Sequence, residues 1–385
     1  MIAKIAVPRI LRIGSGALAE TREVLQTLGL HSPLIVTDPY LRKRGLARML
    51  SEHLNPLGQS RIFSDTVSDP TVKAVEAGVD FLMNGDHDCV IGLGGGSSID
   101  TAKAIAVLAV HGGKMRDYKA PHDQSEPGLP IVAIPTTAGS GSEATRFTIV
   151  TDEATEEKML CVGLAYLPQA AIVDCELSFT KPMRLTADTG VDSLTHAIEA
   201  YVSRHANPFT NSFALTAMRT IWTNLPTACF ESDNRAAREA MMLAATQAGI
   251  AFSNSSVALV HGMSRPIGAK FHVPHGMSNA MLLPTVTAFS ISGALDRYAE
   301  CSRAMGMVPV DASDEEAAAE LVENLRELTR KLKVPTPAEF GIERRIWEAN
   351  IDSMVREAIA SGSPANNPRV PSAEEIEELY HTIWG

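Results

Sequence analysis

The sequence lacks the features that mark several large classes of protein. Its 385 residues contain only five cysteines, an odd number, scattered singly and without a CxxC pair. This argues against a disulfide framework and favours a reducing compartment such as the cytoplasm. Acidic residues outnumber basic ones by 45 to 34, and the net charge of −11 argues against nucleic acid or an anionic membrane as a partner.

The sequence also lacks a run that is long and apolar enough to cross a bilayer. The longest small, apolar stretch, residues 102–110, contains Lys103 and is much shorter than the ~20 residues that a membrane-spanning helix needs. Residues 1–18 lack the basic segment followed by an unbroken apolar segment that marks a signal peptide. With 45% hydrophobic and 21% charged residues, the composition predicts a soluble globular protein of about two domains.

The first 180 residues alternate short apolar runs with segments of helical periodicity. The runs predicted to be strands are residues 33–38, 60–65, 89–94, 130–135 and 170–174. The predicted helices between them are residues 41–54, 72–83 and 99–110. This alternation predicts an α/β domain whose parallel sheet is covered by helices on both faces. In such sheets, ligands bind beyond the carboxyl ends of the strands.

After Lys181 and Pro182 the pattern changes to long helical segments with few β-branched runs. These segments are residues 186–204, 211–225, 235–252, 284–305, 317–332 and 373–383. We therefore predict two domains, an α/β domain at residues 1–180 and an all-helical domain at residues 181–385.

A glycine-rich turn leads from one predicted strand into a helix in VIGLGGGSSIDTAKA. Gly94, Gly95 and Gly96 let the backbone approach a ligand closely, and the free N–H groups of the helix start suit a phosphate. The turn does not complete GxGxxG, because Ser97 replaces the last glycine. The structural alternative is that Ser97 and Asp100 form a capping box at an ordinary strand–helix turn.

Two other predicted strands are followed by polar groups that could serve the same ligand. One is followed by PTTAGSGSEAT, which contributes Thr136, Thr137, Gly139, Ser140, Gly141 and Ser142. The other ends at Asp38, whose carboxylate could bond ribose hydroxyls and so favour NAD over NADP. The alternatives are an ordinary polar loop in the first case and a loop acid ahead of Pro39 in the second.

The second half carries residues with the character of a metal site. Asp192 and His196 are spaced i, i+4 in a predicted helix, so a carboxylate and an imidazole share one face. His261 closes a predicted helical run, and His275 follows a proline turn in HVPHG, where Gly276 relieves crowding. One oxygen and three nitrogens suit a borderline divalent metal such as iron(II) or zinc. Any one of these histidines could instead be a core residue that a backbone carbonyl satisfies.

Taken together, the motifs of both halves resemble those of the iron-containing, or group III, alcohol dehydrogenases, which are related in fold to glycerol dehydrogenase and dehydroquinate synthase. The resemblance covers almost the whole chain. It rests on GLGGGSSID, PTTAGSGSE, DCELSFTKP, the DxxxH at Asp192 and His196, VHGMSRPIGAKFHVPHG followed by SNAMLLP, and NNPRVPS. It implies a dehydroquinate synthase-like α/β domain that binds NAD, and an all-helical domain that binds a divalent metal, iron(II) or zinc. It also implies a homodimer or a larger homo-oligomer.

The resemblance assigns roles to individual residues. It implies that the metal ligands are Asp192, His196, His261 and His275. It implies a cofactor site made by Asp38, Gly95, Gly96, Ser97, Thr136, Thr137, Ser142, Lys158 and Leu177. Gly94, Asp100 and Ser140 join this site from the two turns described above.

One position departs from the family pattern. Many members have a second histidine four residues after the ligand that His261 matches, and here that position is Arg265. Arginine cannot relay a proton at neutral pH, so His272 is the better candidate for a catalytic relay. A guanidinium binds carboxylate, sulfonate or phosphonate, which leads to the hypothesis that the substrate carries an anionic group. The alternative is that Arg265 pairs with a protein acid or with the cofactor's pyrophosphate.

The predicted function is hydride transfer between NAD(H) and a small alcohol or aldehyde, assisted by a metal. No protein nucleophile is apparent, because there is no GxSxG motif and no cysteine in the motifs above. One alternative is a metal- and NAD-dependent lyase or cyclase of the dehydroquinate synthase type. Another is a non-catalytic assembly protein, against which the retention of all four metal-binding residues argues.

Overall fold

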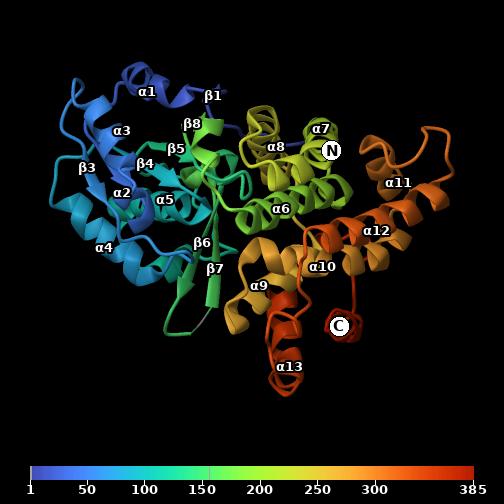
Figure 1. The fold of residues 1–385 in the computed structure, drawn as a ribbon. Coiled ribbons are helices and arrows are strands. Elements are labelled where there is room, and N and C mark those ends of the chain that lie inside the picture. The colour runs from blue at the N-terminus through green and yellow to red at the C-terminus, as the bar shows by residue number, and fades with distance from the viewer. Residues whose placement is uncertain (1, 156) are drawn as a thin grey trace. The chain divides into compact units, whose positions relative to one another are not determined.

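A computed structural model describes residues 2–155 and 157–385, which form two compact units (Figure 1). One unit spans Lys4–Thr180, and the other consists chiefly of Lys181–Gly385. The first is built on a parallel sheet and the second is helical, so the predicted fold class is confirmed.

Six strands form the parallel sheet of the first unit. They are β1 (Ile10–Ile13), β2 (Pro33–Val36), β3 (Arg61–Phe63), β4 (Cys89–Gly94), β5 (Ile131–Pro135) and β8 (Ala170–Val173), in the order β1-β8-β5-β4-β2-β3. Every pairing between neighbours is parallel. All five predicted strands are present, and only the partly exposed edge strand β1 was not predicted.

Helices cover both faces of this sheet, as the alternating pattern predicts. Helices α1 (Thr21–Leu28) and α3 (Leu46–Leu54) pack on the face that carries Ile35 and Ile91. Helices α4 (Val72–Met83) and α5 (Gly96–His111) pack on the face that carries Leu34 and Val90. Because both faces are buried, the central strands consist almost entirely of apolar residues and glycine.

The helix predicted over residues 41–54 is interrupted. The chain forms a short α2 (Pro39–Lys43) and then α3, because Gly45 between them adopts a left-handed conformation with φ of 82°. A right-handed helix cannot continue through such a residue, so the apolar periodicity across the break is shared by two helices.

A two-stranded antiparallel sheet, absent from the sequence-based prediction, follows β5. It pairs β6 (Phe147–Asp152) with β7 (Glu157–Val162). The buried Lys103 of α5 attaches this hairpin, since its ammonium group donates to the Thr145 carbonyl at 2.9 Å and to the Phe147 carbonyl at 2.8 Å. A third hydrogen bond, to Thr145 Oγ1 at 3.1 Å, completes the set that an ammonium group can make.

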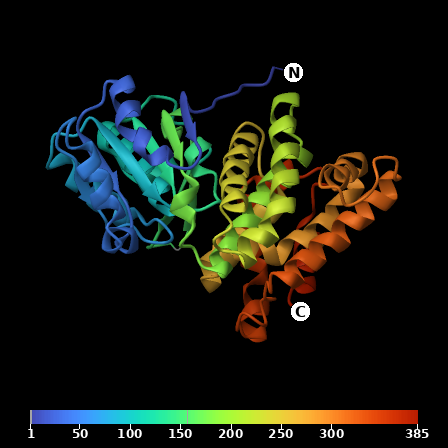
Figure 2. The same ribbon diagram turned by 45° about the horizontal axis from the view of Figure 1, so that its top comes forward.

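The second unit consists of helices (Figure 2). They are α6 (Met183–Val202), α7 (Pro208–Phe230), α8 (Arg235–Ser253), α9 (Leu259–Phe271), α10 (His275–Ser290), α11 (Leu295–Ala304), α12 (Asp314–Lys331), α13 (Arg344–Ala360) and α14 (Ala373–Thr382). Among the described residues, no helix is long and apolar enough to cross a membrane.

One predicted helix of this unit, residues 284–305, is wrong in its extent. Helix α10 begins earlier, at His275, and ends at Ser290, after which a 3-10 turn (Ile291–Gly293) leads into α11. A Cβ atom on Gly293 would lie 2.4 Å from the backbone nitrogen of Arg369. The helix therefore ends where the C-terminal segment packs against it, a contact that local periodicity does not reveal.

Candidate metal centre and nucleotide site

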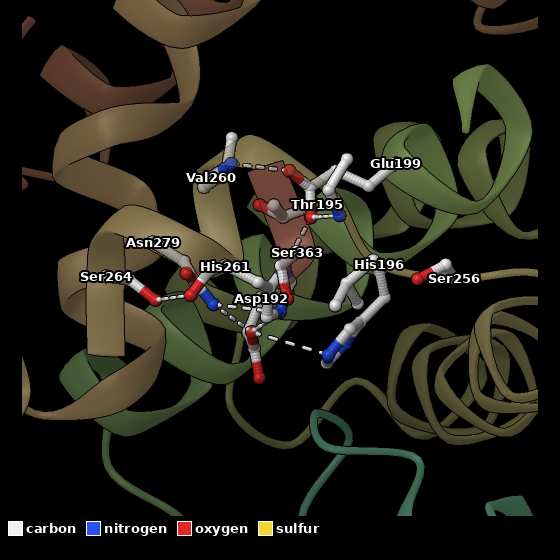
Figure 3. A network of polar contacts seen from close by, with 12 residues as sticks. Asp192, Thr195, His196, Glu199, Ser256, Val260, His261, Ser264, Asn279 and Ser363 are labelled. Atoms are coloured by element: carbon white, nitrogen blue, oxygen red, sulfur yellow. Dashed lines mark hydrogen bonds and ion pairs between the residues drawn. The ribbon is translucent and has the colours of Figure 1, made fainter. Parts of the chain in front are cut away.

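Three helices bring the four predicted metal ligands together. Asp192 and His196 lie one turn apart in α6, and His275 is the first residue of α10. His261 is the third residue of α9, so the expectation that it closes a helical run is wrong. Figure 3 shows Asp192 with His196 and His261 around it.

The ligand atoms of these four residues converge on one small volume. One oxygen or nitrogen atom from each lies within 4.8 Å of those of the other three. Asp192 Oδ1 lies 3.5 Å from His261 Nε2, 3.7 Å from His275 Nε2 and 3.9 Å from His196 Nε2. The side chains of all but His275 are buried, and the side chain of His275 is 36% exposed.

Gly276 allows this convergence. From the sequence we expect this glycine to relieve crowding beside His275. A Cβ atom on Gly276 would lie 2.4 Å from the carbonyl oxygen of Asp188 in α6. Such a contact is far too short, so only glycine lets the start of α10 approach α6 this closely. The approach brings His275 to the carboxylate of Asp192, one turn further along α6.

The electrostatics of the cluster favour a cation. Burial by itself would raise the pKa of the Asp192 carboxyl, but the three imidazoles around it outweigh burial and hold that pKa well below its ordinary value. The carboxylate therefore keeps its negative charge while it faces the imidazole nitrogens. A buried anion beside three nitrogen donors fits a divalent metal ion of borderline softness.

Glu199, which the sequence analysis missed, orients one of these imidazoles. Its Oε2 accepts a hydrogen bond from His261 Nδ1 at 2.7 Å and from the Ala258 backbone N–H at 2.8 Å. Its Oε1 accepts from the Val260 N–H at 2.6 Å. Because Nδ1 carries the proton, the lone pair of His261 Nε2 faces Asp192 and is free for a metal. The available signal was an acid three residues after His196 in the otherwise apolar stretch AIEAYV.

The glycine-rich turn and the polar loop lie against each other in the first unit. A Cβ atom on Gly96 would lie 2.7 Å from Ser140 Oγ, and one on Gly95 would lie 3.6 Å from Thr137 Oγ1. Gly94 has a φ of 152°, and a Cβ atom on Gly94 would lie 3.5 Å from Asp38 Oδ2. The glycine-rich turn, the polar loop and Asp38 thus meet at the carboxyl ends of β2, β4 and β5, an arrangement that we call the cradle. The close contacts at Gly94 and Gly96 leave no room for a side chain at either position.

The proposed capping box at this turn is wrong. Gly95 is the N-cap of α5, and no side chain caps it. Ser97 Oγ donates a hydrogen bond to the Ser68 carbonyl instead. Asp100 accepts from Ser142 Oγ at 2.5 Å and from the Ile149 N–H at 3.0 Å, so it braces the polar loop and the hairpin.

The other residues predicted to contact the cofactor have varied surroundings. Asp38 caps α2, since its Oδ1 accepts from the Leu41 N–H at 2.8 Å. Lys158 in β7 forms an ion pair with Asp69 at 3.0 Å. Leu177 follows β8 and lines a hollow of about 480 Å³.

The two predicted catalytic residues lie in the middle of α9 and at its C-terminal end. His272 is its C-cap, with a left-handed φ of 56° and an exposed side chain. Arg265 is partly buried, and its Nη1 donates to Ser363 Oγ at 3.2 Å. Among the described residues, no carboxylate forms an ion pair with the guanidinium within 4.0 Å, although the charge of Glu199 raises the pKa of Arg265 against the effect of burial.

Comparison with known proteins identifies the family. The family model described as iron-containing alcohol dehydrogenase matches residues 8–175, and the model of the Fe-containing alcohol dehydrogenase family, C-terminal, matches residues 186–384. The chain belongs to the iron-containing alcohol dehydrogenase family. It is 36% identical over 375 residues to an NAD-dependent methanol dehydrogenase of Bacillus methanolicus, with 97% of each chain covered.

Solved structures agree with this assignment. The fold matches the crystal structure of a 1,3-propanediol oxidoreductase with a TM-score of 0.95, 33% identity and full coverage of both chains. It matches a sulfoacetaldehyde reductase of Bifidobacterium kashiwanohense in complex with NAD+ with a TM-score of 0.89, 27% identity and coverage of 100% and 99%. The protein is therefore an oxidoreductase of the iron-containing alcohol dehydrogenase type with a cluster of residues that could hold the metal ion, and the lyase and assembly-protein alternatives are set aside.

The orienting role of Glu199 predicts the effect of replacing it. In Glu199→Gln, an NH2 group must replace one of the two oxygens that accept N–H groups. It either faces His261 Nδ1 and shifts the ring proton onto Nε2, where it blocks a metal, or it faces the Val260 N–H and weakens the contact that holds the ring in place. Metal affinity, measured by competition with a chelator, should fall about 10- to 100-fold. Glu239→Gln, an exposed carboxylate on α8, is the control and should bind metal as the natural protein does. Equal affinity in both variants would refute the role.

Proposed function

We propose that Asp192, His196, His261 and His275 are the ligands of the catalytic metal. The convergence of their donor atoms within 4.8 Å is the observation that carries this assignment. When bound, the metal supplies Lewis acidity toward the substrate oxygen, and NAD supplies the hydride acceptor. The chain's own contribution is to hold the carboxylate ionised, to keep His261 in one tautomer through Glu199, and to bury the cluster from bulk water.

We propose that the cradle at the carboxyl ends of β2, β4 and β5 holds the dinucleotide. The free N–H groups at the start of α5 would bind a phosphate there, and the glycines let the polar loop approach this helix start closely. The contacting residues are Asp38, Gly94, Gly95, Gly96, Ser97, Thr136, Thr137, Ser140, Ser142, Lys158 and Leu177, with Asp38 at the adenosine ribose. Asp100 acts indirectly, because its carboxylate is occupied by Ser142 and Ile149.

The metal assignment is tested by removing one imidazole. His196→Ala should retain far less than one metal per chain after loading with iron(II) or zinc under anaerobic conditions. The accumulation of NADH with a short alcohol should slow about 1000-fold or more, because Lewis-acid assistance contributes several kcal/mol. His205→Ala, an exposed histidine that bonds Asn366, is the control and should keep metal and rate. Full metal content in His196→Ala would contradict the assignment.

We propose that Arg265 binds an anionic group on the substrate. Burial lowers the pKa of its guanidinium, no carboxylate is within 4.0 Å, and its Nε has no hydrogen-bond partner among the described residues. A partly buried guanidinium without an ion-pair partner is stabilised when it binds a carboxylate, sulfonate or phosphonate. Because Arg265 lies one helical turn after His261, such a group would sit beside the metal centre. The related sulfoacetaldehyde reductase acts on a substrate of this class, as its name states.

The substrate proposal is tested with pairs of aldehydes of similar length. The first pair is sulfoacetaldehyde and propanal, and the second is succinate semialdehyde and butanal. In each pair the first compound is anionic and the second is neutral. Arg265→Ala should lower kcat/KM for the anionic member about 10- to 100-fold, which corresponds to one charge-assisted hydrogen bond. Arg265→His, which restores the residue of many relatives, should leave the neutral member unaffected or improved. Equal losses on both members would remove the proposal.

We propose that His272 passes the hydroxyl proton to solvent. It lies in HVPH, three residues before His275, and its exposed side chain can exchange protons with water. His272→Asn is a suitable test, because asparagine tolerates the left-handed C-cap conformation. The variant should keep its metal and its KM for NAD while kcat falls about 100-fold, in the usual range for general acid–base catalysis. An unchanged kcat would assign the relay to water alone.

Two wider properties complete the proposal. A cytoplasmic location fits the five cysteines, which are all buried as free thiols. A homodimer or larger homo-oligomer fits the exposed apolar side chains of Ile5, Val7 and Ile13 near the N-terminus. The molar mass in solution tests the second property, and a monomer at micromolar concentration would contradict it.

A further inference from the structure

Ser363 lies against the helix that carries Arg265. It is the first residue of a 3-10 turn, η7 (Ser363–Asn366), which follows α13, and its side chain is buried. A Cβ atom on Gly262 would lie 2.8 Å from Pro364 Cδ, so this turn packs closely against α9 one helical turn before Arg265. Arg265 Nη1 donates a hydrogen bond to Ser363 Oγ at 3.2 Å. The chain therefore places a serine hydroxyl beside the guanidinium that we propose to bind the substrate.

Other hydrogen bonds hold the η7 turn in place. Asn366 Nδ2 donates to Ser256 Oγ at 2.6 Å and to the Val257 carbonyl at 3.3 Å, both in the segment that leads into α9. The Arg204 backbone N–H, just after α6, donates to the Asn366 carbonyl at 2.9 Å. Because these contacts do not involve a ligand, the Ser363 hydroxyl is positioned against α9 before a substrate binds, which lowers the cost of binding.

The hydroxyl proton of Ser363 is available to a ligand. A serine hydroxyl has one O–H donor and two acceptor sites, and the bond from Arg265 uses one acceptor site. The Ser363 backbone N–H donates to Ser361 Oγ at 3.3 Å, and no described residue accepts the hydroxyl proton. Arg265 Nε is also buried without a hydrogen-bond partner in the described part of the chain. A neutral donor and a charged donor thus lie side by side.

An anionic group suits this pair of donors. The oxygens of a carboxylate, sulfonate or phosphonate accept from an O–H and an N–H at once, whereas the alkyl end of a neutral aldehyde accepts from neither. Hydrogen bonds to a charged acceptor are also stronger than those between neutral groups. Since the two donors come from separate elements, α9 and η7, an anion with two or more oxygens can bond both.

We propose that Ser363 is a specificity-determining residue whose hydroxyl donates a hydrogen bond to the anionic group of the substrate beside Arg265. This inference rests on the proposed function, since it takes the anion-binding role of Arg265 as given and adds a second donor to it.

The experiment compares sulfoacetaldehyde with propanal in variants of Ser363. Ser363→Ala removes the donor, and Ser363→Thr keeps a hydroxyl. Ser353→Ala is the control, because Ser353 Oγ in α13 donates only to the Asn350 carbonyl, at 2.8 Å. Ser363→Ala is also combined with Arg265→Ala. The values of kcat and KM are measured separately for each aldehyde.

In Ser363→Ala, kcat/KM for sulfoacetaldehyde should fall about 10-fold more than kcat/KM for propanal, the scale of one hydrogen bond to a charged group. The loss should appear mainly in KM, because the anionic group is bound equally in the ground state and the transition state. Ser363→Thr should recover most of the loss, and Ser353→Ala should match the natural protein. In the Arg265→Ala background, Ser363→Ala should cause a further selective loss, since the hydroxyl binds the anion itself.

Equal changes for both aldehydes in Ser363→Ala would overturn the inference. The absence of a further selective loss in the Arg265→Ala background would also overturn it, and would leave Ser363 as a residue that only positions Arg265. If the alanine variant does not fold, Ser363→Cys gives the same comparison, because a thiol has a similar shape and is a weak donor.

A failure of the proposed function gives a different result. If Arg265 does not bind the substrate's anionic group, Arg265→Ala shows no selective loss on sulfoacetaldehyde. If only the Ser363 inference is wrong, Arg265→Ala shows that loss, while Ser363→Ala affects both aldehydes equally or adds nothing to Arg265→Ala.

Discussion

The helical unit depends on one constraint, which is that several electron-rich atoms share one buried volume. Asp192 Oδ1 and the Nε2 atoms of three histidines face one another across 3.5 to 3.9 Å. Such an arrangement is favourable only when positive charge lies among them, because an uncompensated buried carboxylate costs several kcal/mol. The packing of α6, α9 and α10 is therefore matched to a cation, and the close contact at Gly276 serves that match.

The two candidate sites are built from different groups. In the first unit, the cradle is made largely by backbone, and glycines let the turn and the polar loop approach each other at the carboxyl ends of the strands. Its side chains mostly brace the surrounding loops, as Asp100 and Lys103 do. In the second unit, side chains make up the candidate metal site and other side chains orient them, so we expect single substitutions to have sharper chemical consequences there.

Much of this architecture follows from local patterns. Buried strands with continuous apolar runs, such as β4, were predicted at their observed bounds. The β6–β7 hairpin was missed, because FTIVTD and EKMLCV show neither strict alternation of apolar and polar residues nor a continuous apolar run, and both strands are only partly buried. The break after α10 and the failed capping box at Ser97 share another cause. In both places a partner distant in the sequence, near Arg369 or at Ser68, replaces the expected local interaction.

The sequence by itself determined the class of each unit, the spacing of Asp192 and His196 on one helical face, and the motifs that mark the family. These are consequences of periodicity and of residue chemistry over a few neighbouring positions. Only the tertiary structure decided that Glu199 orients His261, 62 residues away, and that Asn279 meets Asp192 across 87 residues. A buried acid or amide in an apolar helix looks the same in a sequence whether it faces a ligand or the core. The difference arises when helices far apart along the chain pack together, because packing sets which polar atoms must find partners in one another.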